Sequence, residues 1–202
     1  MIQKVLNILK VVTFSLLVAD LEAQDTVSVK NWTLEKQQLN KRGMVFLTSW
    51  ASVNIASGTA ALITHSYEEK CFYSMNSGWG LVNLVIAVPS LVAKPKTYSN
   101  TQQLSTDLKR TEKIFLINAG LDVVYIGAGI GAMEFAKSRQ NIKEKEMYSG
   151  FGKSFIVQGT ALLFFDAFMY QMNKKLRIKV KANQQQVALF VSPSNFHFIY
   201  RF

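Results

Sequence analysis

Two carboxylates, Asp122 and Asp166, stand inside long apolar stretches of the sequence. A carboxylate in an apolar environment must be protonated or find partners, and two at one depth would influence each other. Such a pair could hold a proton or a cation, and the apolar stretches contain no lysine or arginine as a counter-ion. Amides accompany the carboxylates, and together they form a candidate intramembrane polar layer: Asn54, Asn83, Asn118, Asp122, Gln158 and Asp166.

The polar residues interrupt four apolar stretches, residues 44–63, 71–93, 114–133 and 154–173. Each has about twenty residues, the length that an α-helix needs to cross a hydrocarbon core of roughly 30 Å. Charged connectors between them keep the mean hydropathy of the 202 residues at only +0.12. We therefore predict an all-α membrane protein, with a four-transmembrane-helix bundle over residues 44–173.

Helix geometry gives the polar residues a common arrangement. In the third stretch, Asn118, Asp122 and Tyr125 share one helix face. When depth is counted from one side of the membrane at 1.5 Å per residue, four polar residues fall within roughly 5 Å of one level: Asn54, Asn83, Asp122 and Asp166. This predicts a single polar layer in the bundle. Its simplest role is to hold the helices together through hydrogen bonds.

Tryptophans accompany two of the amides. Trp50 and Asn54 are four residues apart in the first stretch, as are Trp79 and Asn83 in the second, so each pair shares a helix face. Both tryptophans lie deeper than an interfacial aromatic belt. We expect Trp50, Trp79 and Tyr125 to support the polar layer from the core of the bundle.

Glycines favour close helix packing in the same region. The third stretch contains Gly127-x-x-x-Gly131, a spacing that lets membrane helices approach closely. Packing alone is the simplest account of this motif.

The formal net charge of +10 comes from basic residues clustered where the apolar stretches end. This placement suits anionic lipid headgroups better than a nucleic acid, so we expect the bilayer as the partner, with a homo-oligomer or another membrane protein as a further alternative. Cys71 is the only cysteine, and His65 and His197 are far apart. No metal site and no cofactor are therefore expected.

The N-terminus gives conflicting signals about topology. Residues 1–23 have the basic, apolar and small-residue order of a cleavable signal peptide, followed by a polar segment over residues 24–43. Cleavage after Ala23 would place both mature termini outside. About 14 lysines and arginines lie in the N-terminal segment, the 94–113 connector and the tail, and about 6 lie in the other loops. This distribution favours termini on the cytoplasmic side. Either the first segment is a retained amphipathic helix on the cytoplasmic surface, or this protein departs from the charge rule.

The C-terminal residues 174–202 change the period of the pattern. Leu176, Ile178 and Val180 alternate with basic residues, and aromatic residues alternate up to Phe202. Alternation of this kind is typical of β-strands. The sequence therefore predicts a small, basic C-terminal β meander.

Four motifs between about residues 36 and 172 can be compared with known families. They are Gly43-Met44 with Trp50 and Asn54, Met75-Asn76 with Trp79 and Asn83, the run Asn118 to Ile126, and Gly150 to Ser154 leading to Gln158-Gly159 and Asp166. In these motifs the chain resembles a family of unknown function, whose members are small bacterial membrane proteins with a leader and four predicted spans. The resemblance implies membrane location and the four-span layout, and it implies no activity.

Three functions fit this sequence. The first is a non-catalytic protein of the bacterial inner membrane whose polar layer organises the helix bundle. The second is a small ion or proton channel or transporter that uses Asp122 and Asp166. The third and weakest is an intramembrane enzyme, because no nucleophile, metal cluster or phosphate-binding loop accompanies the two carboxylates.

Overall fold

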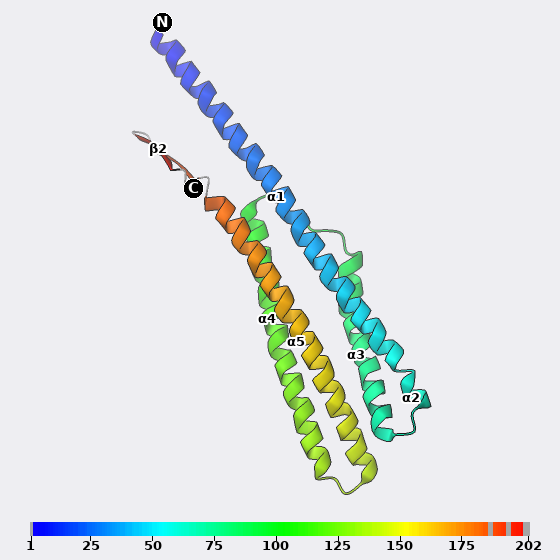
Figure 1. The fold of residues 1–202 in the computed structure, drawn as a ribbon. Coiled ribbons are helices and arrows are strands. Elements are labelled where there is room, and N and C mark those ends of the chain that lie inside the picture. Colours follow the sequence, from blue (N-terminus) through cyan, green and yellow to red (C-terminus); the bar gives the residue numbers. More distant parts are fainter. Residues whose placement is uncertain (1, 186–187, 193–194, 200–202) are drawn as a thin grey trace.

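The computed structural model describes the backbone of residues 2–185, 188–192 and 195–199, and the side chains of residues 28–182. Figure 1 shows an elongated bundle of long helices. In chain order the elements are α1 (Ile2–Ser57), α2 (Ala60–Ile63), α3 (Tyr67–Val92), α4 (Thr101–Lys137), α5 (Ile142–Gln185), β1 (Ala188–Ser192) and β2 (Asn195–Ile199).

Two antiparallel helix pairs make up the bundle. α1 packs along α3 and α4 packs along α5, while α3 also contacts α5 and so joins the two pairs (Figure 1). Polar caps start two of the helices. The Ser66 side chain accepts a hydrogen bond from the Glu69 backbone N–H, and the Asn100 side chain accepts one from Gln103. Because successive long helices run in opposite directions, the loop 93–100 lies at one end of the bundle, and the loops 58–66 and 138–141 lie at the other (Figure 1).

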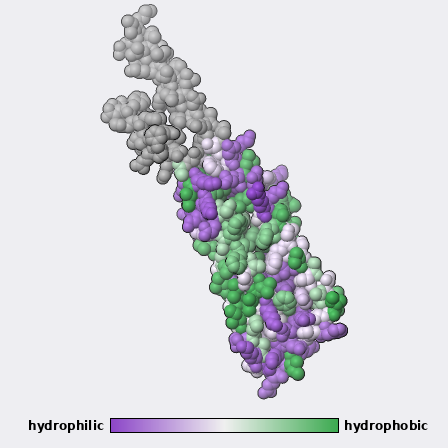
Figure 2. Space-filling model, viewed as in Figure 1, coloured by the Kyte–Doolittle hydropathy of each residue, from purple (hydrophilic) through white to green (hydrophobic). Residues whose placement is uncertain are grey.

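The outer surface of the bundle is apolar over its middle. Four helical stretches are long and apolar enough to cross a membrane: Ser28–Ile63, Tyr67–Val92, Thr101–Lys137 and Ile142–Ala182. Large apolar side chains on them, such as Val85, Val124 and Phe164, are exposed. On the face drawn in Figure 2, hydrophobic residues gather mainly between more hydrophilic ends. This is the pattern of a multi-pass membrane protein, in which lipid covers the exposed apolar residues.

Glycines let α4 and α5 meet backbone to backbone. A Cβ atom added at Gly129 would lie 2.6 Å from the carbonyl oxygen of Gly152, and one added at Gly159 would lie 2.9 Å from that of Asp122. Contacts this short leave no room for a side chain. Gly127 and Gly131, by contrast, have no atom within 4 Å of an added Cβ. The glycine that packs is therefore Gly129, and the predicted Gly127-x-x-x-Gly131 motif is wrong as a contact within the chain.

The helices continue past the apolar stretches into what we call the connector-side extension: residues 28–42 of α1, the loop 93–100, residues 101–113 of α4 and residues 174–182 of α5. Its core is formed by four buried residues with Trp32 and Tyr98 packed against them: Leu104, Leu108, Leu176 and Val180. The Lys36 ammonium is buried in an ion pair with Asp107, which also accepts a hydrogen bond from Tyr98. The extension is thus packed like a soluble helix bundle.

The predicted C-terminal β meander is wrong, and the body of the protein is an all-α four-helix bundle. α5 continues as one helix to Gln185, so residues 176–181, the predicted first strand, are helical. Leu176 and Val180 are buried and Ile178 is 54% exposed. The buried residues are therefore four apart, the period of a helix face rather than of a strand. The paired segments β1 and β2 follow as a two-stranded hairpin outside the bundle. Residues 200–202 lie outside the described residues.

Replacing Gly129 with alanine tests the contact between α4 and α5. G129A should lower the free energy of unfolding by about 1–3 kcal/mol, because its methyl group forces the two backbones apart. The matched control is G127A, which adds the same methyl group to open space on the same helix. Its stability should be unchanged or raised by up to about 1 kcal/mol. Thermal unfolding in one detergent would compare the two, and equal losses would contradict the packing assignment.

Candidate functional site

Gln158 is the centre of a buried hydrogen-bonded cluster that joins α1, α3 and α5. Its side chain is fully buried. Its amide Nε2 donates to the Oδ1 of Asn54 at 2.5 Å and to the Oδ1 of Asn76 at 2.9 Å. Its Oε1 accepts a hydrogen bond from the indole Nε1 of Trp50 at 3.0 Å. One side chain therefore links three helices.

The partners of Gln158 are themselves held in place. The Ser154 hydroxyl donates to Asn76 Oδ1 at 2.7 Å, and the Asn54 Nδ2 donates to the Trp50 carbonyl oxygen at 2.8 Å. Asn54, Asn76 and Ser154 are all buried. We call Trp50, Asn54, Asn76, Ser154 and Gln158 the amide cluster. Each of its hydrogen bonds lies in a region without water to replace it, so losing one leaves buried polar atoms unpaired.

Two members of the amide cluster were not among the predicted site residues. Asn76 lies near the start of its apolar stretch and was not counted as a mid-membrane residue. Its position seven residues before Asn83 places both on one helix face, and Ser154 lies four residues before Gln158. These spacings were the available signal for both residues.

Asp122 on α4 and Asp166 on α5 form a second group. Both are buried, with 3% and 5% of their surface exposed. Their side chains lie within hydrogen-bonding reach of each other, and the Asn118 side chain lies within reach of Asp166. We call these three residues the carboxyl group. The structure thus brings together the two carboxylates that the sequence placed in separate helices.

The polar residues form two tiers rather than one layer. Gln158 in the amide cluster and Asp166 in the carboxyl group are eight residues apart on α5, which corresponds to about 12 Å along the helix. Asn54 is hydrogen-bonded to Gln158, and no hydrogen bond between Asn54 and Asn83 is found in the described part of the chain. The predicted grouping of Asn54 with Asp122 and Asp166 at one level is therefore replaced by two separate sites.

Trp79, Tyr125 and Phe155 form an aromatic group near both tiers. The ring centroids of Trp79 and Tyr125 are 4.9 Å apart, and those of Trp79 and Phe155 are 5.8 Å apart, both in edge-to-face geometry. Such contacts add about 0.5–1.5 kcal/mol per pair beyond burial. The indole Nε1 of Trp79 and the Nδ2 of Asn83 are buried without a hydrogen-bond partner. The predicted supporting aromatics thus have different roles: Trp50 is hydrogen-bonded, whereas Trp79 and Tyr125 pack against each other.

The described ion pairs lie toward the ends of the bundle, and they include no residue of either tier. Arg177 pairs with Glu112 through two hydrogen bonds, of 2.6 and 3.0 Å, in the connector-side extension. Lys153 pairs with Glu68 at the opposite end. Among the residues with described side chains, no group of three or more histidine, cysteine, aspartate or glutamate residues could hold a metal ion. The two tiers offer hydrogen bonding by amides and acid–base chemistry by one carboxyl pair.

Replacing Gln158 with leucine tests the amide cluster. The variant leaves Trp50 Nε1 and the oxygens of Asn54 and Asn76 without their Gln158 partner. Since each hydrogen bond within a membrane is worth about 0.6–2 kcal/mol, the free energy of unfolding should fall by about 2 kcal/mol. The control is Gln171→Leu, the same change at an exposed position on the same helix. Unfolding in detergent is the measurement, and equal stability of Q158L and Q171L would refute the central role of Gln158.

Comparison with known proteins identifies the family of the chain. A search of curated proteins and a search of solved structures find no match. A family model described as a family of unknown function, DUF6992, matches residues 46–167. The match covers more than half of the chain and includes both the amide cluster and the carboxyl group. The predicted resemblance to a domain of unknown function is therefore confirmed, whereas a bacterial source and a leader stay predictions. The chain belongs to the DUF6992 family.

Proposed function

We propose that this chain is a non-catalytic integral membrane protein whose amide cluster fixes the arrangement of its transmembrane helices. The observation that carries the proposal is the fully buried Gln158, which hydrogen bonds to residues on α1 and α3 at once. In a bilayer the hydrophobic effect does not drive helices together, so hydrogen bonds and close packing determine their partners. The amide cluster supplies the hydrogen bonds, and the glycine contacts between α4 and α5 supply the close packing.

A second candidate function is a small proton or ion channel or transporter. The observation in its favour is the contact between the Asp122 and Asp166 side chains inside the apolar part of the bundle. Ionisable residues are rare at such depth and mark ion or proton pathways in many membrane proteins. An intramembrane enzyme is the weakest alternative, because among the described side chains its support is limited to the same carboxyl pair.

A flux assay distinguishes the two candidates. The purified protein is reconstituted into liposomes that contain a pH-sensitive dye, and a potassium diffusion potential drives proton movement. If the protein is structural, the proton flux should be the same for liposomes with the wild-type protein, for empty liposomes and for liposomes with the variant D122N/D166N. Flux that exceeds empty liposomes and is lost in D122N/D166N would overturn it and support transport.

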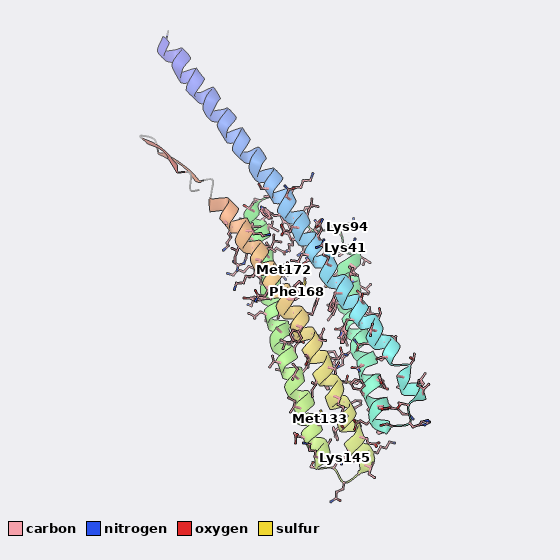
Figure 3. The ribbon with its side chains drawn as sticks, viewed as in Figure 1. Lys41, Lys94, Met133, Lys145, Phe168 and Met172 are labelled. Atoms are coloured by element: carbon pink, nitrogen blue, oxygen red, sulfur yellow. The ribbon has the colours of Figure 1, made fainter. Side chains whose placement is uncertain are left out.

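We further propose that the connector-side extension faces the cytoplasm of a bacterial inner membrane and contacts anionic lipid headgroups. Figure 3 marks two of its basic residues, Lys41 on α1 and Lys94 after α3, near the same end of the bundle, whereas Met133 and Lys145 lie toward the opposite end. Positive residues favour the cytoplasmic side, and each near the surface adds about 1 kcal/mol of attraction to anionic lipids. The basic residues of this end are Lys30, Lys36, Lys41, Arg42, Lys94, Lys96, Lys109, Arg110, Lys113, Lys174, Lys175, Arg177, Lys179 and Lys181.

The orientation can be tested with single cysteines in a Cys71→Ala background. Ser99→Cys places a thiol in the connector loop, and the matched Ser138→Cys places one in the loop between α4 and α5; both positions are exposed. A membrane-impermeant maleimide should label Ser138→Cys in intact cells and Ser99→Cys only after lysis. The reverse pattern, together with a mature N-terminus at Gln24, would instead support cleavage of residues 1–23 and an outward-facing extension.

A further inference from the structure

The contact between Trp79 and Tyr125 fixes the relative position of α3 and α4 beside the carboxyl group. Asn83 lies one turn beyond Trp79 on the same face of α3, and Asp122 lies one turn before Tyr125 on the same face of α4. Because α3 and α4 run in opposite directions, both steps lead toward the same end of the bundle (Figure 1). The ring contact of 4.9 Å at one turn therefore places Asn83 and Asp122 at one level in the next turn.

The polar atoms at this level complement each other. The Asn83 side chain is 3% exposed and its Nδ2 has no hydrogen-bond partner, and the Asp122 side chain is 3% exposed with its Oδ2 unpartnered. Nδ2 is a donor and a carboxyl oxygen is an acceptor. The Asn118 side chain on α4 lies within hydrogen-bonding reach of Asp166. Amide groups of α3 and α4 thus lie at the level of the carboxyl pair.

The surroundings of the pair contain no opposite charge among the described side chains that contact it. The nearest ionisable groups on its own helices are Tyr125, one turn from Asp122, and Tyr170, one turn from Asp166. The nearest basic residues are Lys174 on α5 and Lys113 on α4, eight and nine residues from the pair. The ion pair of Glu112 with Arg177 lies ten and eleven residues away, about 15 Å along the helices. At this level α3 presents Asn83, and α1 presents Phe46, whose ring stacks on that of Phe165 beside Asp166. Two ionised carboxylates in contact would therefore repel each other in an apolar medium without compensation.

We propose that Asp122, Asp166, Asn83 and Asn118 form an intramembrane proton-binding site that holds one proton between the two carboxyl groups. The proton is covalently bound to an oxygen of one carboxyl, which donates a hydrogen bond to an oxygen of the other. The site then carries a single negative charge, and the side-chain N–H groups of Asn83 and Asn118 are the donors available to stabilise it. Loss of the proton to a base or to water leaves two carboxylates, and regain restores the hydrogen bond.

This inference deepens the second candidate function, since it names the proton as the species that such a pathway would use. It concerns binding, and so it can hold even if the reconstituted protein moves no protons. It is also separate from the amide cluster, because no member of that cluster belongs to the site.

Infrared spectroscopy of the full-length protein in liposomes tests the proposal. A protonated carboxyl has a carbonyl band that is resolved from the band of ionised carboxylates and shifts on exchange into D2O. The wild-type protein at neutral pH should show one such band from the buried pair. It should be lost in D122N and in D166N, in which the new amide supplies the donor, and retained in the control Glu134→Gln, which alters an exposed glutamate. Asn83→Ala should shift the band without removing it.

The outcomes separate the proposal from its alternatives. A wild-type spectrum without a D2O-sensitive acid band would overturn it, and this readout requires no variant to fold. A band that disappears when choline chloride is replaced by sodium chloride at constant pH would also overturn it, in favour of a metal-cation site. A band present in the wild-type protein together with no proton flux would support the site and reject transport.

Discussion

The structure depends on one constraint: polar groups in a hydrocarbon environment must find their partners inside the protein. Each helix satisfies its own backbone, but the side chains of Asn54, Asn76 and Gln158 can do so only across helices. Their hydrogen bonds therefore determine which faces of α1, α3 and α5 meet. α4 joins by a different means, the close approach of its backbone to α5 at Gly129 and Gly152. The two kinds of contact also occur together, because Gly80 of α3 approaches the backbone of Ala51 on α1, and Asp122 of α4 contacts Asp166 on α5.

The sequence predicted the membrane class and the burial of the polar residues. Asn54, Asn83, Asp122, Gln158 and Asp166 are all buried in the described structure, as their positions in apolar stretches indicated. It could not predict their pairing. Partner choice depends on the rotation of each helix and on its offset along its neighbour, and an offset of one turn, about 5.4 Å, exchanges one partner for the next. The depth of a residue, when counted from the end of its apolar stretch, is uncertain by a similar distance.

The C-terminal error has a related cause. Leu176, Ile178 and Val180 fit a two-residue period, but Leu176 and Val180 alone also fit a helix. The choice depends on whether Ile178 is buried, and it is exposed because α4 covers only one side of α5 at this point. Tertiary contacts therefore decide between two patterns that the same residues allow. The extension also shows why the polar connector 94–113 is not merely a loop: its second half provides Leu104 and Leu108 to a core.

The three tryptophans of the chain divide among the three polar regions of the bundle. Trp32 packs on the core of the connector-side extension, Trp50 donates to the amide cluster, and Trp79 contacts Tyr125 one turn from the carboxyl group. Because indole emission depends on its immediate surroundings, a chain that keeps only one tryptophan would report on one region alone. Each of the three regions thus contains one native fluorophore. With single-tryptophan variants, the order in which the three regions unfold can be followed without an added dye.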